Sequence, residues 1–142
     1  MNPLVRAFGS GVNETRPGAT DPRLRGRTYA IPFEDVWNAS LQLVEGGLRR
    51  WRLLEADDEQ GVIRAEATSP VLRRVSEARI RICLDENAQT RVDALTRPRS
   101  GKPGSRARGR RLIKAFFRSL DRRVAASQDR ILDPTQKPTW TG

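Results

Sequence analysis

The chain has 142 residues, of which 27 are Lys or Arg and 17 are Asp or Glu, so its formal net charge is +10. This length suits one domain with one hydrophobic core, and the charge predicts attraction to nucleic acid, anionic lipid or an acidic protein face. The absence of His removes the commonest general base and metal ligand, and the single Cys excludes an internal disulfide.

Residues 1–27 predict an extended N-terminal arm, because they are rich in Gly, Pro, Asn, Thr and Arg and show no hydrophobic period. Phe8 belongs to a small apolar cluster in this arm, and we expect it to contact a partner. Residues 1–9 lack the apolar region and cleavage site of a secretory signal, and no apolar run approaches the ~20 residues of a membrane span. We therefore expect a cytoplasmic protein, peripheral at the cytoplasmic face if it meets a membrane.

A short strand and an amphipathic helix follow the arm. Residues 28–31 predict the strand, and Pro32 stands at a helix N1-like position, followed by Glu34 and Asp35 in the first turn. Apolar residues then recur at helical spacing until Gly46-Gly47 ends the helix. The stripe expected to face the core comprises Phe33, Trp37, Leu41, Val44 and Leu48.

The middle of the chain predicts four antiparallel strands. They lie at residues 50–56, 62–68, 75–84 and 89–96, separated by polar turns or a Ser-Pro break. Apolar and charged residues alternate, which places one face of the sheet on the core and the other in water. In the third strand the residues expected to face the core are Ala78, Ile80, Ile82 and Leu84. Cys83 lies in the same apolar run, and we expect a small buried residue rather than a nucleophile.

The C-terminal part predicts a loop over residues 97–111, then a helix to about residue 127 and a tail over 128–142. The inward stripe of the helix comprises Leu112, Ile113, Phe116, Leu120 and Val124. Phe117 adjoins Phe116, and one of the two is expected to face outward. Trp140 stands in a polar tail, where an aromatic residue suits an interface.

These elements predict an α+β domain over residues 28–127. Its fold is an antiparallel β-meander sheet covered on one face by two helices, with extended N- and C-terminal arms at 1–27 and 128–142.

Three segments carry a family resemblance. EARIRI at 77–82, TRVDALTRPR at 90–99 and RRLIKAFFRSL at 110–120 resemble the family named domain of unknown function 1499, as does GVIRAEAT at 61–68. The resemblance covers roughly residues 28–125, one compact domain. It implies the fold but no established activity, and family members in bacteria and plastids are often tied to membranes. The family's acidic turn before the last helix is replaced here by Arg and Pro at 102–109, so that turn's role is not carried over.

The strongest local signal is a basic segment. Between Ala94 and Leu120 there are nine cations and no acid. Such a group attracts lipid headgroups, phosphates or carboxylates, whereas a purely solvated helix face is the ordinary alternative. The residues we expect to bind a partner are Phe8, Arg97, Arg99, Lys102, Arg106, Arg108, Arg110, Arg111, Lys114 and Trp140.

Other functions have weaker support. No catalytic triad, phosphate loop or metal-ligand spacing is present, so we expect no enzyme, no cofactor and no metal. Glu66 and Glu77 alternate with Arg on strands, which indicates cross-strand charge pairs. No aromatic residue interrupts the predicted loop over 97–111, which makes nonspecific RNA or DNA binding the second choice. A carrier of a small apolar ligand is a third.

We therefore expect a non-enzymatic accessory subunit. It would dock through the basic loop and the arms onto an acidic surface of a larger, membrane-bound protein complex, with anionic lipid headgroups as a further partner. Because the resembling family has plastid members, a photosynthetic complex is one candidate host.

Overall fold

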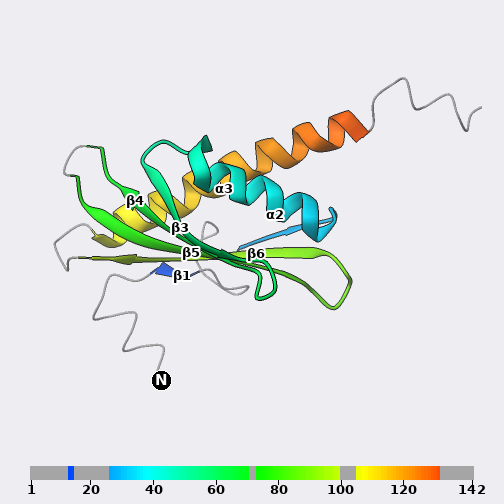
Figure 1. Cartoon of the computed structure of the whole chain (residues 1–142), viewed down its shortest axis with the longest axis horizontal. Helices are drawn as coiled ribbons and strands as arrows, with labels where there is room; N and C mark the ends of the chain where they lie inside the picture. The colour runs from blue at the N-terminus through cyan, green and yellow to red at the C-terminus, as the bar shows by residue number, and fades with distance from the viewer. Residues whose placement is uncertain (1–12, 15–25, 71–72, 100–104, 132–142) are drawn as a thin grey trace, which may run out of the picture.

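The computed structural model describes residues 13–14, 26–70, 73–99 and 105–131, and side chains within 26–70, 73–99 and 107–126. It has the predicted α+β fold, in which an antiparallel sheet is covered on one face by two helices (Figure 1). The predicted arms fall largely outside the described residues. Among the described residues, no helix is both long and apolar enough to cross a membrane.

The sheet is a meander of four strands extended at one edge. The strands β3 (Trp51–Asp57), β4 (Val62–Thr68), β5 (Val75–Leu84) and β6 (Thr90–Pro98) pair in chain order. Two short strands, β1 (Asn13–Glu14) and β2 (Arg27–Tyr29), pair with the far side of β6. Part of the predicted N-terminal arm therefore belongs to the sheet. The bounds predicted for β4 and β5 are confirmed.

The inner face of the sheet carries small and β-branched residues that the helices cover. Buried positions recur at every second residue, as the alternation predicts, with Glu66 of β4 as the exception. The buried residues of this face are Ile63, Ala65, Ala67, Ser76, Ala78, Ile80, Ile82, Thr90, Val92, Ala94 and Thr96. Two expectations are wrong. Leu84, the last residue of β5, is 57% exposed, and Cys83 is half-buried because it lies on the outer face with Arg79 and Arg81.

The first helical segment consists of α2 (Phe33–Gln42) and one π-helical turn, η2 (Leu43–Gly47). Trp37 and Val44 are buried as predicted, but the stripe turns further towards Val36, Ala39, Ser40 and Leu43. Phe33, Leu41 and Leu48 are half-buried around this core. Because Val36, Ala39 and Ser40 lie within the regular α-helix, the buried face of α2 is rotated about the helix axis relative to the predicted stripe.

The second helix, α3 (Ser105–Ile131), supplies the largest core side chains. Ile113, Phe116, Leu120 and Val124 are buried as predicted, and Phe117 is buried too, at 1% exposure. The expectation that Phe116 or Phe117 faces outward is therefore wrong. The strand predicted at 28–31 is present as β2, and its Arg27 guanidinium lies 5.2 Å from the centre of the Phe117 ring.

Tyr29 links β2 to α3 through a side-chain hydrogen bond. Its hydroxyl donates a hydrogen bond of 2.6 Å to Oδ1 of Asp121, whose Oδ2 lies 3.6 Å from Nε of Arg27. Burial, and then the hydrogen bond to the Asp121 carboxylate, raises the pKa of Tyr29 far above its ordinary value. The phenol is therefore held in its neutral form.

Because Tyr29 is the sole tyrosine of the chain, its ionisation is open to direct measurement. We expect no phenolate absorbance in the folded protein near pH 10, where an unfolded tyrosine titrates. Above that pH the unfolded chain loses a proton that the folded chain keeps, so the free energy of unfolding should fall as pH rises. Tyr29→Phe should remove this tyrosine contribution. Phenolate formation at about pH 10 in the folded protein would contradict the assignment.

Candidate functional site

The predicted basic loop is shorter than expected. Arg97 lies in β6, which continues to Pro98, and α3 begins already at Ser105. Arg and Ala favour a helix, and the single Gly109 costs only about 1 kcal/mol there. Gly109 is also buried. A predicted loop over 97–111 is therefore wrong at both ends.

The predicted site residues fall into three groups. Arg97, Arg99, Arg111 and Lys114 are exposed, and Arg108 and Arg110 are half-buried on α3. Arg106 belongs to α3, but its side chain lies outside the described part. Phe8, Lys102 and Trp140 also lie outside the described residues.

The antiparallel meander gathers arginines from four places at one end of the sheet. β3 and β5 begin at this end, β4 and β6 end there, and α3 begins beside it (Figure 1). We call this surface the basic end. Its arginines are Arg50, Arg52, Arg73, Arg74, Arg97, Arg99, Arg108, Arg110 and Arg111. Arg50, Arg73, Arg97 and Arg111 are exposed and form no ion pair with any described residue.

Several of these arginines lie close enough to repel one another. Burial, and then repulsion from Arg74 and Arg111, lowers the pKa of Arg108 below its usual value. The first turn of α3 also contains no acidic residue, although a helix N-terminus favours negative charge. Arg73 has φ of 51°, a conformation that costs a non-glycine residue about 1–2 kcal/mol. An anionic partner at the basic end would relieve the repulsion between its arginines.

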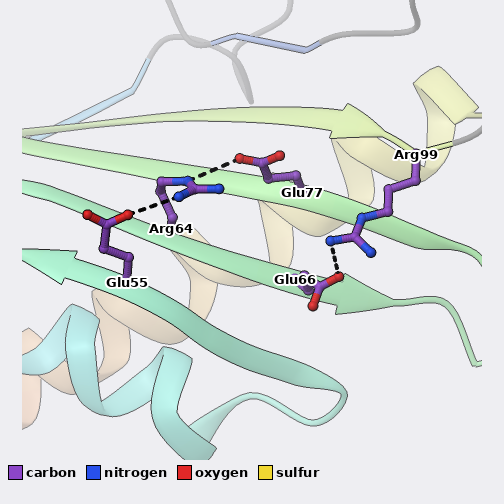
Figure 2. A network of polar contacts seen from close by, with 5 residues as sticks. All are labelled: Glu55, Arg64, Glu66, Glu77 and Arg99. Atoms are coloured by element: carbon purple, nitrogen blue, oxygen red, sulfur yellow. Dashed lines mark hydrogen bonds and ion pairs between the residues drawn. The ribbon is translucent and has the colours of Figure 1, made fainter.

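Two ion-pair networks cross the outer face of the sheet beside the basic end (Figure 2). In the first, Arg64 donates from Nη1 to Glu55 at 2.9 Å and from Nε to Glu77 at 3.3 Å. Its pKa is raised by these bonds, with Glu55 the larger cause. In the second, Glu66 pairs with both Arg52 and Arg99. The predicted cross-strand charge pairs are confirmed, because Glu66 pairs with Arg52 and Glu77 pairs with Arg64.

The opposite end of the sheet is acidic. The β3–β4 turn carries Asp57, Asp58 and Glu59, and the β5–β6 turn carries Asp85 and Glu86. Oδ1 of Asp57 and of Asp85 accepts backbone hydrogen bonds that shape these turns. The remaining three carboxylates are exposed. Arg81 and Arg91 also lie towards this end. The described domain is therefore electrically polar along its strands, with nine arginines gathered at one end and the carboxylates of both turns at the other.

Reasoning along the chain missed four arginines of the basic end: Arg50, Arg52, Arg73 and Arg74. Each is far in sequence from the predicted loop at 97–111. The predicted meander could have identified these four arginines, because antiparallel pairing places the start of one strand beside the end of the next.

The described residues contain no group of three or more His, Cys, Asp or Glu side chains placed to hold a metal ion. No family model, curated protein or solved structure matches this chain. The resemblance to the domain of unknown function 1499 family therefore stays a prediction.

Proposed function

We propose that this protein is a non-enzymatic accessory subunit that docks through its basic end onto an acidic surface of a larger protein complex. The observation that supports this is the gathering of exposed arginines from the start of β3, the β4–β5 loop, the end of β6 and α3 at one end of the sheet, with the carboxylates of two turns at the other end. Such a separation of charge is suited to binding an anionic surface in one orientation.

Protein carboxylates are the partner that this surface suits best. Guanidinium groups grip carboxylates through two parallel hydrogen bonds. The aromatic residues of the described part lie in or against the core, and Leu84 is the one large apolar side chain there that is exposed. A nucleic acid would therefore find arginines for its phosphates but, in the described part, no exposed ring for its bases.

The carrier alternative has no supporting observation in the described residues. Phe116, Phe117, Ile113 and Leu120 fill the space between sheet and helices, each with 1% exposure or less.

In this proposal the host complex lies at the cytoplasmic face of a membrane, where anionic headgroups add to the attraction. Phe8 and Trp140 would extend the contact beyond the basic end. A photosynthetic complex is one candidate host.

A charge reversal at the basic end is expected to weaken docking strongly. Arg73→Glu with Arg111→Glu changes two exposed side chains that pair with no described residue. We expect the full chain with both changes to bind fluorescent poly-L-glutamate about tenfold more weakly or worse than the original chain at low salt. Fluorescence anisotropy at several salt concentrations measures this.

The matched control is Arg118→Glu with Arg122→Glu, which makes the same change in net charge further along α3, on exposed side chains. Equal losses in the two variants would mean that binding follows net charge, and would contradict a localised site. Binding to duplex DNA at equal salt is the second comparison. Tighter binding to DNA than to poly-L-glutamate would favour the nucleic-acid function instead.

A further inference from the structure

A buried carboxylate lies inside the basic end. The Glu66 side chain is 8% exposed, whereas its partners Arg52 and Arg99 are 72% and 57% exposed. One carboxylate oxygen faces each guanidinium, with Oε1 towards Arg52 and Oε2 towards Arg99. Arg99 follows β6 and reaches across β5 to Glu66 on β4 (Figure 2). Glu66 is therefore a negative charge beneath two exposed arginines.

The ion pairs to Glu66 hold the two arginine side chains in place but use only part of their hydrogen-bond donors. A guanidinium has five N–H donors, and the ion pair to Glu66 engages Nη2 of each. No described residue engages the remaining donors of either guanidinium, which can therefore bind a partner. An arginine held in one geometry has less side-chain freedom to lose on binding, and that loss otherwise costs about 0.5–1.5 kcal/mol for each side chain. Glu66 also offsets the repulsion between Arg52 and Arg99.

We propose that Glu66 is a positioning residue of the basic end, which holds Arg52 and Arg99 ready to grip the carboxylates of an acidic protein. This inference rests on the proposed docking function. It predicts that removing a negative charge from a positive surface weakens the binding of a negatively charged partner. Simple attraction by net charge predicts the reverse.

The test measures binding of the full chain to poly-L-glutamate with two substitutions at this position. Glu66→Gln should bind about fivefold more weakly or worse. Glu66→Asp keeps the charge and shortens the side chain by one methylene, so net charge predicts no change and positioning predicts weaker binding. The Asp variant also covers the case in which the Gln variant does not fold.

The matched control is Glu77→Gln. Glu77 is the direct cross-strand neighbour of Glu66, but its partner is Arg64. It undergoes the same charge change, and we expect unchanged or slightly tighter binding. With Arg52 and Arg99 both replaced by Ala, Glu66→Gln should have no further effect, a result that general destabilisation would not produce.

The outcomes separate the two proposals. If the original chain binds poly-L-glutamate and the Glu66 variants bind as tightly as Glu77→Gln, the positioning role is wrong while docking stands. If the original chain does not bind at all, the docking function is overturned, and the positioning role with it.

Discussion

Gly61→Ala is expected to lower the free energy of unfolding by about 3 kcal/mol. Gly61 closes the β3–β4 turn at φ of 70°, a conformation that L residues rarely adopt. A Cβ placed there would lie 2.1 Å from the backbone oxygen of Ile82, so the neighbouring strand would have to move. That movement would also break the 2.7 Å hydrogen bond from the Ile82 N–H to the Gly61 oxygen. Urea unfolding followed by circular dichroism measures the loss.

Two companion substitutions separate backbone torsion from the steric clash. Gly61→Asn adds a residue that tolerates positive φ but keeps the clash, so it should be nearly as harmful as Ala. Ala88 has φ of 60° in the β5–β6 turn, and Ala88→Gly should be neutral or stabilising, within about 1 kcal/mol. A fully stable Gly61→Asn variant would show that torsion alone decides the effect.

Phe116→Ala is expected to destabilise the domain by about 3–5 kcal/mol. The Phe116 side chain is completely buried, stacks on Trp51 with ring centres 6.0 Å apart, and meets the edge of Phe117 at 5.5 Å. Truncation would remove the contact that joins α3 to the first strand of the meander and would leave a cavity between the layers. The midpoint and slope of urea unfolding report both the loss and any change in cooperativity.

Leu84→Ala provides the contrast, because it truncates a large apolar residue that is 57% exposed. We expect a change within about 0.5 kcal/mol. Phe116→Leu should lie between the two, since it leaves a smaller cavity. If Phe116→Ala cost no more than Leu84→Ala, the packing described for α3 would be wrong.

The sheet and both helices could be predicted from the sequence because each carries a clear period. Apolar and charged residues alternate through the centres of β4 and β5, and turn or break signals flank both strands, so even their bounds were correct. The stripe of α2 was less well placed, because the small residues Ala39 and Ser40, which carry little hydrophobic signal, are buried, whereas the larger Phe33 and Leu41 are only half-buried. The strand β1, only two residues long, gives no pattern at all.

The candidate site was predicted only in part. The run of cations from Arg97 to Lys114 stands out in the sequence, but its division between β6 and α3 depends on where a helix rich in Arg begins. Arg52 and Arg73 become part of the surface only through strand pairing between distant segments. The carboxylate of Glu66 could be assigned to a cross-strand pair from alternation, but its burial beneath two arginines requires the third dimension.

The separation of arginines and carboxylates along the strands also bears on the kinetics of docking. A molecule polarised in this way experiences a torque as it approaches an anionic surface, and the torque turns the arginine end forward before contact. A larger share of collisions then begins in a productive orientation. Added salt should therefore slow association much more than it speeds dissociation, because screening removes the torque before it loosens the pairs formed at contact.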